Sequence, residues 1–179
     1  LVAVGDYFGQ SHYLLAAQAD EIILHPHGGI SLMGFGVYRT YLKQFLDNIR
    51  VKFHVFRAGE NKSAVEPYLR DDMSPQERIV VARWLNSLWD DYTAQVEKGR
   101  GKSEGDVTAF VNDFPARLEA NGGDLAQVFL QEGYVDALLS GDEVEARVRE
   151  IVDAVDDDGD VALVGLRRYL IDTRQPRDE

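Results

Sequence analysis

Two short, unbroken apolar runs near the start of the chain limit what it can fold into. Leu1 to Val4 ends at Gly5-Asp6, and Glu21 to His25 ends at Pro26, with a helical pattern from His12 to Ala19 between them. Runs that are apolar on both faces are typical of buried strands in a parallel sheet, whereas half-exposed strands alternate. A helix between two such strands predicts a βαβ unit and an α/β fold.

The next forty residues predict a bend, a helix and a further strand. An apolar stripe from Val37 to Ile49 predicts a helix, and Val51 to Arg57 alternates as a strand does. Glycines set among apolar residues predict a close approach of the backbone or a bend. These glycines are Gly28, Gly29, Gly34 and Gly36.

A long helix is the most strongly indicated element. Ser74-Pro75-Gln76-Glu77 combines an N-cap serine, proline at the first helical position and glutamate at the third, and the pattern continues to about Lys98 before Gly99. The rest of the chain is predicted to be mainly helical. Helices are expected at Ser103–Phe110, Asp124–Gln131 and Asp142–Val155, and strand-like or packed pieces at Tyr134–Leu139, Val161–Val164 and Tyr169–Ile171.

Composition excludes some classes of function. The formal charge is −12, and residues 101–179 hold 8 basic against 19 acidic side chains, whereas residues 1–100 hold 11 against 12. Nucleic-acid binding requires clustered Lys and Arg, so no nucleic-acid partner is expected. The absence of cysteine excludes disulfides and a cysteine nucleophile. Because the chain opens without Met on an apolar strand, we expect an excised fragment whose parent has further segments.

Lys62 is the leading candidate for chemistry. It lies in the stretch Gly59–Pro67, after the predicted strand and beside Ser63, Ala64 and Val65. Strand ends are the usual place for active sites in α/β folds, but most lysines are simply exposed. To act as a base near pH 7, a lysine needs its pKa lowered from about 10.4 by roughly 3 units. The residues alone leave both interpretations open and identify no nucleophile nearby.

Other candidates have weaker patterns. His25 and His27 lack the further ligands of a metal site, so a local turn or a solvated pair is the better interpretation. Asp156 to Asp160 resembles a calcium loop but has Ala154 and Gly165 at ligand positions. Ser11-His12 are adjacent on a predicted helix and point apart. No metal site is therefore predicted.

A longer stretch resembles a known family. The chain is similar, over nearly its whole length, to the N-terminal domain of the long-form bacterial signal peptide peptidase A family, also called protease IV. A dozen consecutive near-matching residues make this resemblance far more specific than a short motif. The matching segments are Phe56–Pro67, Arg70–Pro75, Val4–Asp6, Ala19–Ile22, Gly34-Phe35, Arg83-Trp84, Trp89 and Val135–Leu138.

The resemblance implies a crotonase-like (Clp protease-like) α/β fold with a helical C-terminal part, and a serine protease with a Ser/Lys dyad. Lys62 would be the general base, and Gln10 takes the position of the nucleophile, so the serine would come from a C-terminal domain absent from this chain. We expect residues 1–152 to form the protease domain, truncated at its start. Residues 153–179 would be a linker and the first segment of the missing domain.

The resemblance further implies a peptide substrate, no cofactor and no metal ion. The substrates would be cleaved signal peptides and other apolar peptides, with Met33, Gly34 and Phe35 lining the groove. The partners would be the C-terminal protease domain and further copies of the parent, in a tetramer. The parent would lie at the bacterial inner membrane with its catalytic part facing the periplasm, whereas the fragment itself is expected to be soluble and inactive.

Two other classes of function stay open. The chain would be a non-catalytic scaffold for assembly if Lys62 were solvated or paired with Glu60 or Glu66. A crotonase-type acyl-CoA enzyme on the same fold would need basic residues for the phosphates, and the acidic composition weighs against it.

Overall fold

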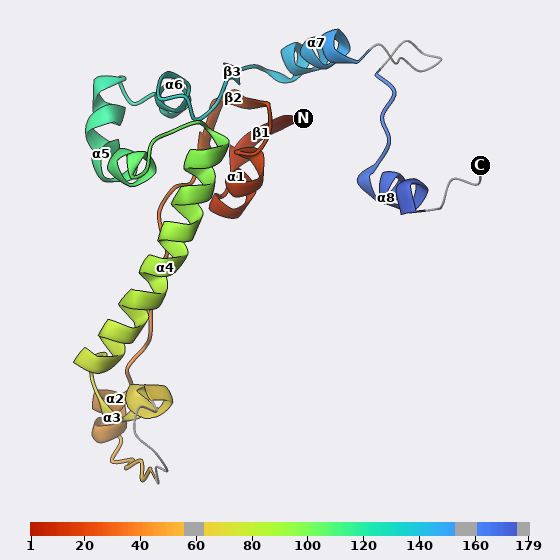
Figure 1. Ribbon diagram of the computed structural model, residues 1–179. Helices are drawn as coiled ribbons and strands as arrows, with labels where there is room; N and C mark the ends of the chain where they lie inside the picture. Colours follow the sequence, from red (N-terminus) through yellow and green to blue (C-terminus); the bar gives the residue numbers. More distant parts are fainter. Residues whose placement is uncertain (56–62, 153–160, 175–179) are drawn as a thin grey trace. The chain divides into compact units, whose positions relative to one another are not determined.

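The computed structural model describes residues 1–55, 63–152 and 161–174, and these residues divide into two units. The sheet unit comprises Leu1–Phe8, Ala19–Ile30 and the chain from Ala116 onward, and the helical unit comprises Gly9–Gln18 and Ser31–Pro115 (Figure 1). The boundary at Pro115 lies within helix α5 (Asp106–Ala120). Each unit is described in its own right.

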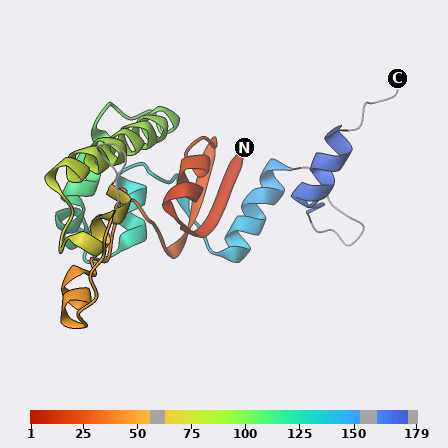
Figure 2. The same cartoon turned by 90° about the horizontal axis from the view of Figure 1, so that it is seen from below.

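Among the described residues, three parallel strands form the sheet, in the order β1 (Val2–Phe8), β2 (Glu21–Ile30) and β3 (Ala137–Leu138). Figure 2 shows β1 and β2 side by side. Ile22 to Leu24 are fully buried because β2 is the central strand and helix α6 (Leu125–Gln131) packs against it. The predicted parallel pairing and the α/β class are confirmed.

Strand β2 runs past Pro26, where the sequence predicted its end. The pairing shifts between Gly5, which faces Leu24, and Tyr7, which faces Gly29, so β2 carries extra residues in an irregular section. Proline lacks a backbone N–H, and this irregular section tolerates it because the regular ladder is interrupted there. The prediction of a stop at Pro26 is therefore wrong.

Gly28 allows strands β1 and β2 to come close together in this irregular section. A Cβ atom at Gly28 would lie 2.1 Å from the carbonyl oxygen of Asp6 and 2.9 Å from that of His25. Only glycine permits so close an approach of two backbone segments. The predicted close backbone approach is confirmed at this glycine.

Replacing Gly28 with alanine should destabilise the sheet unit. The new methyl group would force β1 and β2 apart, and overpacking of this kind costs about 1–3 kcal/mol in the free energy of unfolding. Chemical denaturation of the Gly28→Ala variant measures this loss. Gly141→Ala is the matched control, because nothing lies within 4 Å of its added Cβ, and equal stability of the two variants would contradict the account.

Helix α4 (Pro75–Gly99) is the main element of the helical unit and begins and ends as predicted. Its C-terminal half packs against α1 (Gln10–Ala16) and the residues that follow it. Gln18 Nε2 donates to the carbonyl oxygen of Gln95 over 3.1 Å, and a Cβ at Gly99 would lie 2.2 Å from the carbonyl oxygen of Ala17. Close contact at Gly99 therefore brings the two helices together.

The helix predicted from Val37 to Ile49 is mostly absent. Only α2 (Lys43–Asn48) is helical, and Tyr38 is 97% exposed although it belonged to the predicted buried face. Leu42 instead donates its N–H to the carbonyl oxygen of Pro67, over 2.7 Å, where the chain enters α2. An apolar stripe stabilises a helix only when another surface covers it, and here the stripe stays largely exposed.

The described part of the strand predicted at Val51–Arg57, residues 51–55, has no regular secondary structure, so that prediction is wrong. Phe53 stacks on Tyr68 with ring centroids 4.7 Å apart and planes 13° from parallel. Tyr68 belongs to α3 (Glu66–Leu69). An alternating pattern forms a strand only when it finds a partner strand, and Phe53 has a ring as its partner instead.

The chain after α4 is mainly helical, as predicted. Glu97, buried near the end of α4, accepts hydrogen bonds from the N–H groups of Gly105 and Val107 at the start of α5, each 3.0 Å long. Helix α7 (Gly141–Ile151) follows β3, and Tyr169–Ile171, predicted to be strand-like, lie in helix α8 (Leu166–Arg174). Within the described ranges, no helix has the length and apolar character that crossing a membrane requires.

Candidate functional site

Lys62, the candidate base, lies outside the described residues, as does Glu60. The segment that follows it is described. A 3₁₀ turn, Ser63–Val65, leads directly into α3. The elements on this side of Lys62 are therefore helical, and their anchoring can be examined.

Glu66 anchors this segment to the start of α4. Its Oε2 atom accepts the backbone N–H of Ser74 over 3.1 Å, and its Oε1 atom accepts the Ser74 hydroxyl. The Ser74 hydroxyl oxygen in turn accepts the N–H of Glu77 over 3.2 Å, as an N-cap does. The sequence predicted that Glu77 would complete this capping box, but its side chain pairs with Arg39 at 3.0 Å and Glu66 takes its place.

The hydrogen bond from the Ser74 hydroxyl lowers the pKa of Glu66. This carboxylate is therefore held charged, four residues after Lys62. Sequence reasoning named Glu66 only as a possible partner of Lys62. Its contact with Ser74 joins two residues eight positions apart, and no motif in the sequence predicts it.

Replacing Glu66 with glutamine should loosen the start of α4. Glutamine keeps the shape but has one acceptor oxygen where glutamate has two, so one of the two hydrogen bonds that Glu66 accepts from Ser74 is lost and the other becomes neutral. The free energy of unfolding should therefore fall by about 1–3 kcal/mol. Because the folded pKa is lowered, the charged group stabilises the fold above the unfolded pKa of about 4.3. That contribution disappears as the pH falls through the folded value.

Denaturation between pH 3 and pH 7 tests this prediction. The wild-type chain should lose more stability on acidification than the Glu66→Gln variant does. Glu104→Gln changes an exposed carboxylate and serves as the control. Identical pH profiles for the wild-type and Glu66→Gln chains would refute the role given to Glu66.

Gln10, which the resemblance places at the nucleophile position, holds the turn at Met33 and Gly34. Its Oε1 atom accepts the N–H of Met33 over 3.1 Å and that of Gly34 over 3.0 Å, and its Nε2 atom donates to the carbonyl oxygen of Gly34 over 3.2 Å. Gly34 has φ 77°, in the left-handed region that favours glycine. Gln10 is thus a structural amide here, and Ser11 beside it is exposed.

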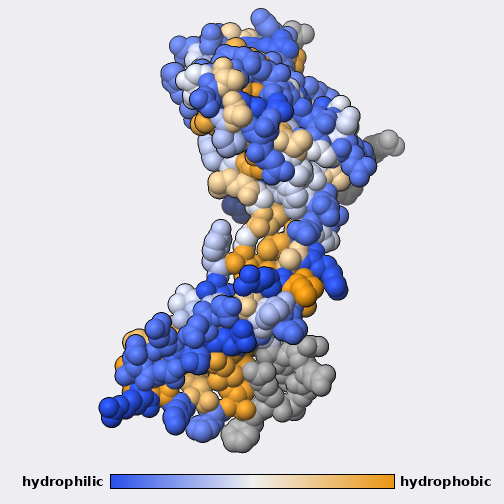
Figure 3. Space-filling view, turned by 90° about the vertical axis from the view of Figure 1, so that its left-hand side faces the viewer, coloured by the Kyte–Doolittle hydropathy of each residue, from blue (hydrophilic) through white to orange (hydrophobic). Residues whose placement is uncertain are grey.

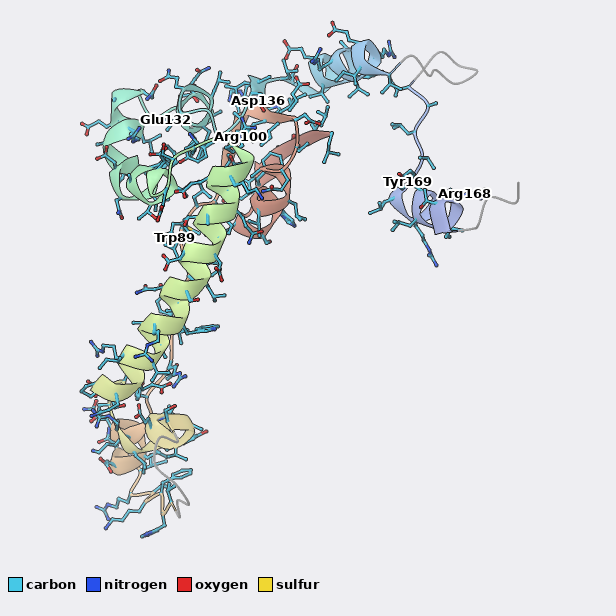
Figure 4. All side chains as sticks on the ribbon, in the orientation of Figure 1. Trp89, Arg100, Glu132, Asp136, Arg168 and Tyr169 are labelled. Atoms are coloured by element: carbon cyan, nitrogen blue, oxygen red, sulfur yellow. The ribbon has the colours of Figure 1, made fainter. Side chains whose placement is uncertain are left out.

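Beside the turn, an aromatic cluster forms the wall of a pocket. Phe35 meets Trp89 and Tyr92 edge-on, with ring centroids 6.4 and 6.2 Å apart, and Trp89 stacks on Tyr92 at 5.6 Å. Figure 4 shows Trp89 on α4. Burial of Tyr92, which is 4% exposed, raises the pKa of its phenol. The pocket measures about 250 Å³, and its lining mixes apolar and polar residues. These are Met33, Gly34, Phe35, Leu85, Trp89 and Val111 together with the polar Asn86, Thr108 and Asn112.

The three predicted substrate-binding residues therefore lie together at one pocket. The contribution of α4 and α5 to its walls was not predicted, because Leu85 and Trp89 were considered only as positions of the long helix and Thr108 and Val111 were not singled out. The link between Gln10 and the turn was also missed, since its partners lie 23 and 24 residues away. No periodic pattern in the sequence predicts that contact.

The two histidines form a local turn. The N–H of His27 donates to Nδ1 of His25 over 3.1 Å, and the rings lie 5.7 Å apart. This contact agrees with the local interpretation made from the sequence. Among the described residues, no cluster of three His, Asp or Glu side chains is placed to hold a metal ion.

Comparisons with known proteins identify the family. Residues 1–154 match the family described as Peptidase family S49. The chain is 41% identical over 143 residues to Protease 4 of Salmonella typhi, which covers 80% of this chain and 23% of that protein. It is 31% identical over 170 residues to Protease 4 of Haemophilus influenzae, covering 95% of this chain and 28% of that protein.

A third relative is the chloroplastic serine protease SPPA of Arabidopsis thaliana, 22% identical over 161 residues, which cover 90% of this chain and 22% of that protein. The chain thus belongs to peptidase family S49, and the resemblance read from the sequence is confirmed at this level. It spans about a quarter of the length of the curated relatives it matches.

Proposed function

We propose that this chain is the lysine-contributing half of a Ser/Lys-dyad serine endopeptidase. The observation that carries the proposal is that, in a chain of a peptidase family, glutamine and not serine stands at the expected position of the nucleophile. The side chain at the nucleophile position is an amide bonded to the Met33–Gly34 turn, and it offers no hydroxyl. The serine is then supplied by another domain, and Lys62 supplies the base.

In the proposed mechanism, neutral Lys62 takes the proton from the serine hydroxyl as its oxygen attacks the scissile carbonyl. The protonated lysine then gives a proton to the leaving amine. Lysine has a single titrating nitrogen, so the dyad needs no third residue to fix a tautomer. The Glu66–Ser74 contact supports the proposal, because it anchors the segment that follows the base.

The finer fold and the setting of the parent are part of the same proposal. The parallel β1–β2–β3 sheet supports a crotonase-like domain over residues 1–152, with residues 153–179 as the passage to a second domain. The pocket beside Gly34 supports cleaved signal peptides and other apolar peptides as substrates, because Phe35, Leu85 and Trp89 give it an apolar wall beside its polar residues. We place the parent at the bacterial inner membrane, with its catalytic part facing the periplasm.

Replacing Lys62 with alanine in the full-length protein should abolish peptide hydrolysis. Loss of a general base lowers the rate by roughly 10²–10⁴-fold, and more when the nucleophile depends on it. Lys62→Arg should be equally inactive, because arginine cannot be deprotonated in proteins. The isolated chain should hydrolyse no peptide at all.

The assay compares kcat/KM of these variants with that of Lys43→Ala. Lys43 is the matched control, since it is a half-exposed lysine that pairs with Asp47 at 2.8 Å in α2. Activity retained in Lys62→Ala, or activity of the isolated chain, would contradict the proposal.

A non-catalytic scaffold is the second candidate, and the surface of α4 favours it. Ile79, Val80 and Trp84 are 61%, 59% and 55% exposed in the N-terminal half of this helix. Figure 3 shows hydrophobic residues gathered on this part of the helical unit. Exposed apolar patches of this kind are typical of interaction sites.

We propose a second copy of the parent as the partner of this surface, in a tetramer. Charge along α4 supports self-association, because its N-terminal half carries exposed Arg78 and Arg83, and exposed Asp90 and Asp91 follow. An antiparallel copy would bring opposite charges together around Trp84, as a twofold interface requires. The acyl-CoA enzyme has no observation in its favour.

Replacing Trp84 with glutamate should weaken assembly of the full-length protein. Truncation of a central aromatic residue costs about 2 kcal/mol or more, which corresponds to about thirtyfold weaker association. Sedimentation equilibrium measures the change. Leu163→Glu, which alters an 87% exposed leucine in the sheet unit, is the control, and equal association of the two variants would disprove this interface.

A further inference from the structure

Two consecutive backbone N–H groups in the helical unit point at a single oxygen atom. The N–H groups of Met33 and Gly34 both donate to Oε1 of Gln10, over 3.1 and 3.0 Å. Successive N–H groups in a turn form a concave site for anions and carbonyl oxygens. Pairs of this kind stabilise the charge that develops on an acyl oxygen in acyl-transfer enzymes. The turn therefore has the donors of an acyl-oxygen site.

The group that fills this site resembles a peptide bond. Gln10 presents a neutral amide, whose oxygen meets both donors while its nitrogen donates to the carbonyl oxygen of Gly34 over 3.2 Å. A peptide carbonyl oxygen is the same kind of acceptor, and because a trans peptide points its N–H away from its oxygen, a peptide would reproduce only the two contacts to the Met33 and Gly34 N–H groups. The present occupant thus shows which chemistry the turn accepts.

The site is open to solvent and adjoins the pocket, whose lining is partly apolar and partly polar. Met33 is 84% exposed, and Gln10 and Gly34 are partly exposed. Met33 and Gly34 also line the 250 Å³ pocket, together with Leu85, Trp89 and others. A peptide whose carbonyl oxygen met the two N–H groups could therefore place a neighbouring apolar side chain in the pocket.

We infer that the Met33–Gly34 turn is a binding site for the acyl oxygen of an apolar peptide, and that Gln10 closes it as an internal ligand. The inference rests on the proposed peptidase function for the choice of a peptide as the external ligand. An external peptide must displace Gln10, so its apparent affinity equals the affinity for the open turn multiplied by the fraction of molecules in which the turn is open. The side chain of serine, two atoms shorter than that of glutamine, would not reach the turn.

Titration of the 179-residue chain by NMR tests the inference. The probes are N-acetyl-leucine methylamide, which offers a peptide carbonyl, and N-acetyl-leucine, which offers a carboxylate. In Gln10→Ala, at least one probe should produce saturable shifts of the Met33 and Gly34 amide signals at millimolar concentration. The wild-type chain should bind at least about tenfold more weakly, because the probe must break the internal hydrogen bonds.

Two further variants sharpen the test. Gln10→Glu keeps an oxygen that accepts both N–H groups but loses the donor to the carbonyl oxygen of Gly34, so it should bind the probes more weakly than Gln10→Ala and more tightly than the wild type. Gln18→Ala is the matched control, since the amide of Gln18 contacts the Gln95 carbonyl and not the turn. Equal probe binding by the wild type and Gln10→Ala, or no shift at these two amides in any variant, would overturn the inference.

Hydrogen exchange of the wild-type chain gives a second test that does not depend on whether a variant folds. Hydrogen exchange at Met33 should be roughly tenfold slower than the intrinsic rate for its sequence, although this residue is 84% exposed, because Gln10 holds its N–H. Unprotected exchange there would also overturn the inference. Neither measurement depends on Lys62 or on catalysis. A negative result here would therefore not contradict the proposed Ser/Lys dyad. An active Lys62→Ala enzyme would contradict the dyad and would not contradict this binding site.

Discussion

The hydrogen bonds between the Glu66 carboxylate and Ser74 hold α3 to the start of α4 in the helical unit. They join α3, which follows Lys62 by a few residues, to the N-cap of the 25-residue helix α4. Part of the pocket wall depends on the same helix, because Leu85, Asn86 and Trp89 belong to it. A single charged side chain thus links α3 to the helix that carries part of the pocket wall.

The second constraint is the amide of Gln10. A backbone turn with two adjacent N–H donors must satisfy them, and the chain does so with its own side chain. In the inference drawn above, Gln10 occupies the two donors of a solvent-accessible turn, so that an external acyl oxygen would have to displace it. In the proposed parent protein, this chain would contribute the base and a closed turn, and the partner domain would contribute the serine.

Much of the fold could be predicted from the sequence. The apolar runs around Val4 and Ile23 specified parallel strands, and the Ser74-Pro75 start and the glycine at residue 99 specified the long helix. These signals are local and strong, because they depend on burial over both faces and on capping. Gly28 was also predicted, since glycine between apolar residues indicates close backbone contact.

The wrong predictions of secondary structure and the contacts that were not predicted all depend on residues distant in the sequence. The apolar stripe at Tyr38 predicted a helix, but no surface covers that residue, and the alternation at Phe53 predicted a strand where a ring stacks instead. The roles of Glu66 and Gln10 arise from tertiary contacts that periodicity cannot show. Lys62 became a candidate through its place after the predicted strand, and the resemblance over a dozen residues gave it the role of base; its own position lies outside the described residues.

The central claim is that Lys62 acts as a neutral base in the assembled protein. Its most direct test is an NMR titration of Lys62 in the full-length protein, with lysine labelled at the side-chain carbon and nitrogen. The account predicts a pKa roughly 3 units below the ordinary value of about 10.4, because a base must be neutral near pH 7. An ordinary lysine pKa in the active assembly would contradict the claim and favour the scaffold.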